Sequence, residues 1–232
     1  MIKLTGHDWA TIEDDLDANG NAILRAVLST DQCAQIAALY DDDAHFRSRV
    51  AMERHNFGRG EYKYFGYPLP DPIQALRECF YACLAPVANR WAVRLSADAR
   101  YPARLDDYLA ECHGAGQRRP TPLMLRYGPG DSNCLHRDLY GERFFPLQAI
   151  IALGQPGVDF TGGELMLVEQ RPRTQSIGRV ICLNRGDAAI IATDYRPRRG
   201  TRGFYRVTAK HGVSPVTRGI RKTLGLIFHD AA

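Results

Sequence analysis

From Pro122 onward the chain is divided into short apolar segments by glycine and proline. The segments cover residues 122–128, 145–153, 163–169, 179–184, 187–193, 203–211 and 220–228. Many short strands at close spacing are typical of a β-sandwich or a β-barrel. The sequence therefore predicts a mainly β core in the second half of the chain.

The first half is predicted to combine one short strand with helices. Residues 22–28 are apolar enough for a buried strand, and Ser29 or Thr30 could cap the helix that follows. A longer helix is predicted from about Asp71, because apolar residues recur there at helical spacing. We expect Pro86 to kink or end that helix.

Length and composition favour one globular domain over residues 1–232, with a helical, lid-supporting region at 1–120 and the β core at 121–232. The chain has 232 residues, of which 45% are hydrophobic and 24% are charged. No apolar run is long enough for a membrane span, and residues 1–8 lack the apolar segment of a signal peptide. We therefore expect a cytoplasmic protein without a membrane partner. The six cysteines form no Cys-x-x-Cys pair, so they indicate reduced thiols and no zinc ribbon.

The charges are unevenly distributed along the chain. Residues 1–47 contain nine acidic and three basic residues, whereas residues 195–229 contain nine basic residues and no acidic one. Such asymmetry suggests an anionic partner on the C-terminal side, although a basic run can also be a solvated surface.

His136, Asp138 and His211 have the residue types of a metal site. A His-x-Asp pair at the end of a strand can bring an imidazole and a carboxylate to one metal ion. A distant histidine then completes the two-histidine, one-carboxylate triad of non-haem Fe(II) oxygenases. A chance surface turn is the alternative for the His-x-Asp pair alone.

The surrounding motifs carry a resemblance to a known family. RYGPG at 126–130 precedes the His-x-Asp pair, FTGGEL at 160–165 lies between the ligands, and HGVSPV at 211–216 leads into Arg221. In this order they resemble the 2-oxoglutarate/Fe(II)-dependent dioxygenases over roughly residues 120–230. The resemblance implies an α+β protein with a mainly β core, a double-stranded β-helix (jelly roll, cupin-like) with flanking N-terminal helices.

Two branches of that superfamily are similar to different parts of the chain. The stretch 126–138 resembles the AlkB-type nucleic-acid dealkylases, but Leu125 and Ile227 replace an asparagine and an arginine of their pattern. The ten-residue step from His211 to Arg221 is more similar to the prolyl hydroxylases. The whole pattern resembles a bacterial group of 2-oxoglutarate oxygenases predicted to act on nucleic acids.

The resemblance implies roles for the motif residues. His136, Asp138 and His211 would bind Fe(II), and Arg221 would pair with the far carboxylate of the co-substrate 2-oxoglutarate. A guanidinium suits that task because its planar fork can donate two hydrogen bonds to one carboxylate. The implied reaction is oxidative decarboxylation of 2-oxoglutarate by O2 to succinate and CO2, coupled to hydroxylation of a second substrate.

Strand alternation adds co-substrate candidates. If Arg221 points into the barrel, Thr223 does so too and could donate to the same co-substrate, while Lys222 faces the other way. A register error of one residue would exchange Arg221 and Lys222. Tyr127 is a further co-substrate candidate by resemblance, with an ordinary core tyrosine as the alternative. Arg218 could be a supplementary cation.

Two stretches could bind a nucleic acid, because they interleave cations with aromatic residues. The first is 196–206 and the second is 54–65, within a candidate lid at 54–67. For both, a β-hairpin with a solvated face is the alternative. The candidate substrate-binding residues are Arg59, Tyr62, Tyr64, Arg198, Arg199 and Arg202.

The predicted function is therefore a 2-oxoglutarate- and Fe(II)-dependent dioxygenase acting on DNA or RNA, by oxidative demethylation or hydroxylation of a base in repair or modification. One alternative is a hydroxylase of a protein side chain or a small metabolite, which the step from His211 to Arg221 favours. Another is a non-catalytic nucleic-acid-binding module, against which the intact triad and Arg221 argue.

Overall fold

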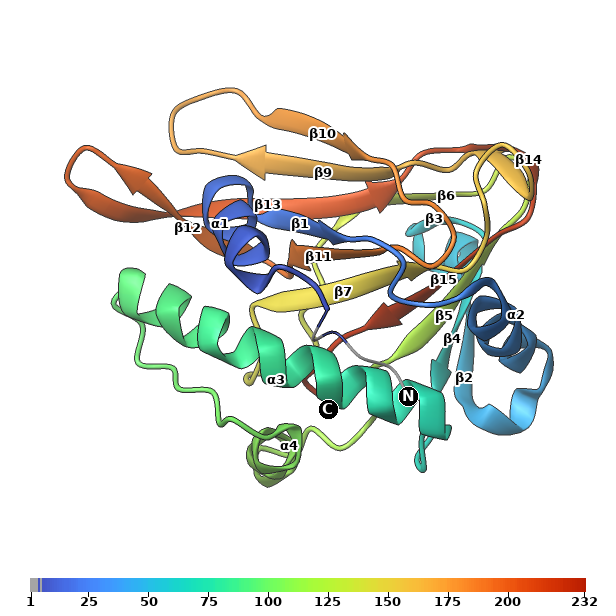
Figure 1. Ribbon diagram of the computed structural model, residues 1–232, viewed down its shortest axis with the longest axis horizontal. Helices are drawn as coiled ribbons and strands as arrows, with labels where there is room; N and C mark the ends of the chain where they lie inside the picture. Colours follow the sequence, from blue (N-terminus) through green and yellow to red (C-terminus); the bar gives the residue numbers. More distant parts are fainter. Residues whose placement is uncertain (1–3, 5) are drawn as a thin grey trace.

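The computed structural model describes residue 4 and residues 6–232, and its helices cover one side of a β structure (Figure 1). The α-helices are α1 (Trp9–Asn19), α2 (Thr30–Ala38), α3 (Asp71–Arg94) and α4 (Leu105–Gly114). Three short 3-10 turns are η1 (Leu39–Asp41), η2 (Asp43–His45) and η3 (Met52–His55). Among the described residues, no helix has both the length and the hydrophobicity that a membrane crossing requires.

The larger of the two main sheets has seven strands. In spatial order they are β1 (Asn21–Leu24), β11 (Ala188–Ala192), β7 (Leu147–Ala152), β15 (Arg221–Leu226), β5 (Leu123–Tyr127), β4 (Glu61–Phe65) and β2 (Phe46–Ala51). All of their pairings are antiparallel. Strands from both ends of the chain therefore meet in one sheet.

The second main sheet has six strands. Five follow the order β10 (Ile177–Ile181), β9 (Leu165–Gln170), β13 (Gly203–Val213), β6 (Ser132–His136) and β3 (Gly58–Arg59), and β12 (Tyr195–Gly200) pairs with β13. A two-stranded sheet joins β14 (Val216–Gly219) to β8 (Phe160–Gly162). Residues of both main sheets line common cavities, so the functional site lies between them. The predicted mainly β architecture with flanking helices is confirmed.

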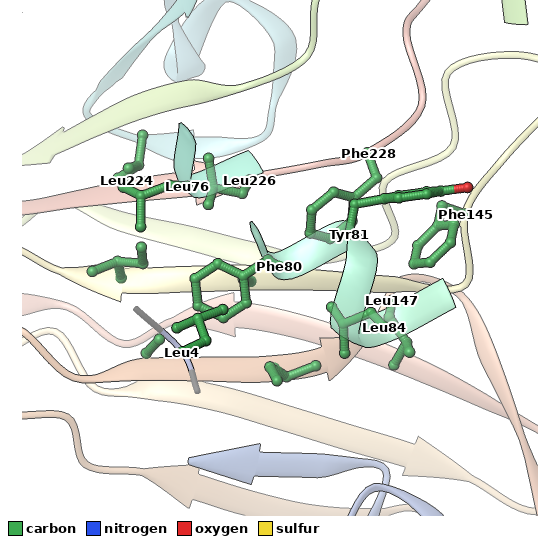
Figure 2. Packing of buried hydrophobic residues seen from close by; sticks show 14 of the residues in the cluster. Leu4, Leu76, Phe80, Tyr81, Leu84, Phe145, Leu147, Leu224, Leu226 and Phe228 are labelled. Atoms are coloured by element: carbon green, nitrogen blue, oxygen red, sulfur yellow. The ribbon is translucent and has the colours of Figure 1, made fainter. Parts of the chain in front are cut away.

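The main hydrophobic core lies between α3 and the outer face of the seven-stranded sheet (Figure 2). From α3 it includes Leu76, Phe80, Tyr81 and Leu84, and from the sheet side Leu147, Leu224, Leu226 and Phe228. Successive strand residues point to opposite faces. Packing of the even-numbered residues of β15 against the helices therefore leaves its odd-numbered residues facing the second sheet.

A local signal explains where α2 begins. The Ser29 side chain accepts from the backbone N–H of Gln32, and the Gln32 side chain accepts from the backbone N–H of Ser29, which makes a capping box. The prediction that Pro86 kinks or ends α3 is wrong in one respect, because the helix continues to Arg94. Residues on both sides of Pro86, such as Leu84 and Trp91, are buried, and their packing stabilises the helix despite the missing N–H donor.

The N-terminal half contains more β structure than predicted. Strands β2 and β4 extend the seven-stranded sheet, and β3 joins the other sheet. The candidate lid at 54–67 is therefore only partly a loop, because its residues 61–64 pair with β5. Gly58 and Arg59 of the same segment pair with β6 in the other sheet.

Candidate metal centre and co-substrate cavity

Three ligand-type side chains converge between the two sheets. In the β13–β6 pair His211 lies directly opposite His136, so both imidazoles are on the same face of the sheet, with ring centroids 4.2 Å apart. Asp138 follows β6 by two residues, and its carboxylate oxygens lie 3.2 Å from His211 Nε2 and 3.6 Å from His136 Nε2. One ligand atom from each side chain falls within 4.8 Å of the others.

The protonation pattern of His136 fits metal binding. Its Nδ1 lies 2.8 Å from the carbonyl oxygen of Cys134, and a carbonyl can only accept a hydrogen bond. The proton therefore sits on Nδ1, which leaves the Nε2 lone pair directed toward Asp138 and His211. Burial, together with the nearby His211, lowers the pKa of His136 and favours this neutral form. Two imidazoles and one carboxylate are the donor set expected for a non-haem Fe(II) ion.

Two neutral donors hold the Asp138 carboxylate in place. The Tyr140 hydroxyl donates to Oδ1 at 2.7 Å, and the Gln148 amide donates to Oδ2 at 2.9 Å. Burial alone would raise the pKa of Asp138, but the charge and hydrogen bond of His211 and the bond from Tyr140 hold it well below its usual range. Asp138 is therefore an oriented, ionised carboxylate.

Arg221 is a buried cation that interacts electrostatically with Glu164 but forms no ion pair with it. Its side chain is 5% exposed, and within the described part of the chain it makes no ion pair. Its single hydrogen bond is a long one, 3.5 Å from Nη1 to the Thr223 hydroxyl, and its guanidinium lies 5.4 Å from the centre of the Tyr127 ring. Burial lowers the pKa of Arg221. An uncompensated buried charge is costly, so this position calls for an anionic ligand.

Two cavities meet at the triad. The smaller has a volume of about 50 Å³ and extends from His136, Asp138 and His211 to Arg221 and Thr223. The larger has a volume of about 370 Å³ and shares His136 and Asp138 with the first. The triad side chains therefore lie between the smaller cavity, which contains Arg221, and the larger cavity.

The structure brings two of the three predicted co-substrate residues to the lining of the smaller cavity. Arg221 and Thr223 line it, and the fully buried Tyr127 accepts a hydrogen bond from the Asn133 amide at 3.3 Å. Lys222 points to the other face, where its ammonium lies 3.2 Å from the carbonyl of Ala37. The register that strand alternation favoured is the one observed.

The predicted substrate-binding residues fall into three places. Tyr62 and Tyr64 line the larger cavity. Arg59 lies outside it and pairs with Glu53 at 2.9 Å, while Arg198 pairs with Glu169 at 2.9 Å. The remaining two, Arg199 and Arg202, lie on the β12–β13 hairpin and have no ion pair among the described residues.

Sequence reasoning missed Tyr140, Gln148 and Gly163. Gln148 had a readable signal, because it is the one polar residue in the apolar strand β7. A Cβ on Gly163 would lie 2.8 Å from Cδ of Arg221, so this glycine makes room for the arginine as well as a turn at φ +67°. Tyr140 lies in a loop, and nothing in its sequence context showed that it reaches Asp138.

Solved structures share this architecture along nearly the whole chain. A Pseudomonas putida prolyl-4-hydroxylase has a TM-score of 0.55 at 14% identity and covers 97% of this chain and 100% of its own. A 2OG-Fe(II) oxygenase family oxidoreductase from Burkholderia pseudomallei has a TM-score of 0.55 at 15% identity and covers 99% and 95%. The epimerase SnoN of nogalamycin biosynthesis has a TM-score of 0.57 at 14% identity and covers 94% and 81%. Such likenesses show the fold.

With the triad and Arg221 between its sheets, the protein is a 2-oxoglutarate/Fe(II)-dependent oxygenase, and Fe(II) and 2-oxoglutarate are its cofactor and co-substrate. It belongs to the Oxygenase-NA family, described as "Oxygenase, catalysing oxidative methylation of damaged DNA", whose model matches residues 60–231. Two uncharacterized proteins, from two strains of Mycobacterium tuberculosis, are each 49% identical over 168 residues, 72% of this chain and 72% of their own.

Proposed function

We propose that this oxygenase oxidises a base of a nucleic acid, and that the larger cavity receives the base. The proposal rests on the lining of that cavity, where aromatic and aliphatic side chains lie next to the predicted metal ligands. Its wall on the seven-stranded sheet alternates Tyr62 and Tyr64 with Leu123 and Leu125 across the β4–β5 pair. A mostly apolar wall that carries two aromatic rings suits a planar base that can stack on one ring and pack against its neighbours.

The charges of the larger cavity favour a neutral substrate group. Apart from the triad residues His136 and Asp138, the charged side chain on its described lining is Arg137, which donates to Asp194 at 2.8 Å. A free carboxylate or ammonium group entering this space would meet no unpaired partner of opposite charge. A nucleobase carries no such group, whereas amino acids and organic acids do.

The smaller cavity suits 2-oxoglutarate. Its keto-acid end would reach the metal held by His136, Asp138 and His211, and its far carboxylate would pair with Arg221. That pairing supplies the anion which the buried guanidinium otherwise lacks. Thr223 lies beside Arg221 and could donate to the same carboxylate. The roles of these residues form part of the proposal.

The chemistry follows from this arrangement. Bound Fe(II), with 2-oxoglutarate and O2, supplies the oxidant that places one oxygen atom on a carbon of the substrate and the other in succinate. If that carbon is a methyl group on a base nitrogen, the hydroxymethyl product breaks its C–N bond and releases formaldehyde. The base then regains its N–H. The family's link to damaged DNA supports this substrate class.

The test measures succinate and formaldehyde from anaerobically Fe(II)-loaded protein, supplied with 2-oxoglutarate, O2 and a panel of N-methylated DNA and RNA oligonucleotides. We expect succinate and formaldehyde in equal amounts with at least one oligonucleotide, and neither from His136→Ala. Tyr62→Ala, which opens the stacking wall but leaves the triad, should lower the oligonucleotide-dependent succinate release.

Other outcomes assign other substrates. Succinate without formaldehyde, together with an oligonucleotide heavier by one oxygen atom, would indicate base hydroxylation. If no nucleic acid raises succinate release while a peptide or metabolite does, the proposed substrate class is wrong and the predicted alternative hydroxylase stands.

A further inference from the structure

The arginines on the two faces of the β12–β13 hairpin have different surroundings. Residues directly opposite each other in an antiparallel pair project to the same face, and alternate residues to opposite faces. On the face shared with His211, Arg196 and Arg198 both pair with Glu169, and Arg196 also donates to carbonyls at the end of α1. These two arginines therefore hold the hairpin to the rest of the fold.

The opposite face carries cations that have no such partner. We define the hairpin strip as the cationic and aromatic side chains on this face, which are Tyr195, Arg199, Phe204, Arg206 and Lys210. Its three cationic residues are exposed, and none makes an ion pair with a described residue. The Arg206 guanidinium lies over the Tyr195 ring, 3.9 Å from its centre. Phe204 is 40% exposed, and the Arg94 guanidinium of α3 lies 4.8 Å from the centre of its ring. Cations and rings thus alternate on one surface.

The strip leads toward the larger cavity. Asp194 immediately precedes Tyr195, its carbonyl accepts from the N–H of Ala209, and its carboxylate accepts from Arg137, which lines the cavity. From Phe204 to Lys210 the strand rises roughly 20 Å at about 3.4 Å per residue. Figure 1 shows the hairpin reaching past the rest of the molecule at the left of the view.

We propose that the hairpin strip binds the single-stranded nucleotides that flank the target base, with Arg199, Arg206 and Lys210 on phosphates and the rings against bases. This inference rests on the proposed function and adds a second surface to it. Cations without ion pairs suit any polyanion, but cations beside the exposed Phe204 and the half-buried Tyr195 favour single-stranded nucleic acid, because each base offers a face for stacking. An acidic peptide would use the charges but not the exposed part of the Phe204 ring.

The test measures binding by fluorescence anisotropy, with the full chain loaded anaerobically with Fe(II) and 2-oxoglutarate. The probe is a labelled single-stranded 12-nucleotide DNA with one N-methylated base, titrated between about 50 and 200 mM salt. The variant is Arg199→Gln/Arg206→Gln. Its matched control is Arg100→Gln/Arg118→Gln, which removes the same charge from exposed arginines whose side chains bond only to backbone carbonyls.

We expect the strip variant to bind at least ~10-fold more weakly than the control at low salt. Its slope of log K against log salt should be smaller by about 1.4, because each single-strand phosphate contact contributes roughly 0.7. In turnover, KM for the 12-nucleotide DNA should rise with kcat unchanged, and a trinucleotide should show a much smaller difference between variant and control.

Equal affinity and equal salt slope in variant and control would overturn the proposal, as would polyglutamate displacing the DNA as well as unlabelled DNA does. If the unmodified protein oxidises DNA and the variant has the same KM for it, the binding role proposed for the hairpin strip is wrong, whereas the proposed function stands. If the unmodified protein neither binds nor oxidises any nucleic acid, both are wrong.

Discussion

The protein buries an arginine near each end of β15, and the surroundings of the two differ. Arg77 of α3 is fully buried beside residues that follow the strand, and it pairs with Asp230 at 2.8 Å. It also donates to the carbonyls of Ile227 and Phe228 and to the Tyr67 hydroxyl. Arg221, at the start of the strand, has one long hydrogen bond and no ion pair among the residues described.

The difference in partners suggests different roles, with Arg77 stabilising the fold and Arg221 binding a ligand. A buried cation paired inside the protein belongs to the fold, because removing one member of such a pair leaves an uncompensated buried charge and is strongly destabilising. For Arg221, which has no such partner, we propose that the 2-oxoglutarate carboxylate supplies the missing anion. Asp138 shows the same division on the acidic side, since Tyr140 and Gln148 orient it while its remaining lone pairs face the two histidines.

The largest expected effect is on stability, from Arg77→Met. The substitution would leave the fully buried Asp230 carboxylate without its cation, which costs about 3–5 kcal/mol of unfolding free energy. Urea unfolding followed by circular dichroism measures this loss, with the exposed Arg118→Met as the control. A loss of unfolding free energy below about 1 kcal/mol would show that Arg77 and Arg221 do not differ in their contribution to stability.

The converse is expected of Arg221→Met. Removing an uncompensated buried charge should leave the unfolding free energy within about 1 kcal/mol of the unmodified protein. KM for 2-oxoglutarate should rise about 100-fold, because charge-assisted hydrogen bonds of roughly 1.5–3 kcal/mol are lost. Succinate release at varied 2-oxoglutarate measures the change. An unchanged KM would show that another cation binds the co-substrate.

A smaller effect is expected of Tyr140→Phe, which removes one donor from Asp138. Loss of a residue that orients a metal ligand costs about 10–100-fold in metal affinity. Titration with Mn(II) under inert gas measures the affinity without turnover. Tyr101→Phe, whose hydroxyl makes a 3.4 Å bond to a carbonyl, serves as the control and should bind Mn(II) as the unmodified protein does.

The smallest effect is expected of Gly163→Ala. Both this glycine and Gly157 have positive φ, so alanine at either position should cost roughly 1–2 kcal/mol of unfolding free energy. At Gly163 alone, the new Cβ would press on the Arg221 side chain, whereas nothing lies within 4 Å at Gly157. We therefore expect KM for 2-oxoglutarate to rise several-fold only for Gly163→Ala. Equal KM values in the two variants would contradict a role for Gly163 beside Arg221.

Much of the fold could be predicted because its signals are local. Each of the seven predicted β segments overlaps a strand, and the cap at Ser29 marks the start of α2. The strands β2 and β4 escaped prediction because neither reads as an isolated apolar run. β4 pairs with β5, a partner about sixty residues away in sequence, and β2 pairs in turn with β4.

The site was predicted unevenly for a similar reason. His136, Asp138, His211 and Arg221 stand at spacings that motifs fix, whereas the partners of a charge depend on side chains from other elements. Arg198 and Arg199 are adjacent and identical in type, yet strand alternation directs the first to Glu169 and the second to solvent. A charge count along the chain cannot separate them.

The sequence by itself determined the class of fold and the chemistry, since strand periodicity and the spaced histidine, aspartate and arginine are properties of the order of residues. Only the tertiary structure decided which buried charges have partners, that Tyr140 and Gln148 hold Asp138, and that two cavities meet at the triad. The physical reason is that periodicity and motif spacing act over a few residues. Whether a buried charge has a partner depends instead on groups that distant strands, loops and helices bring together.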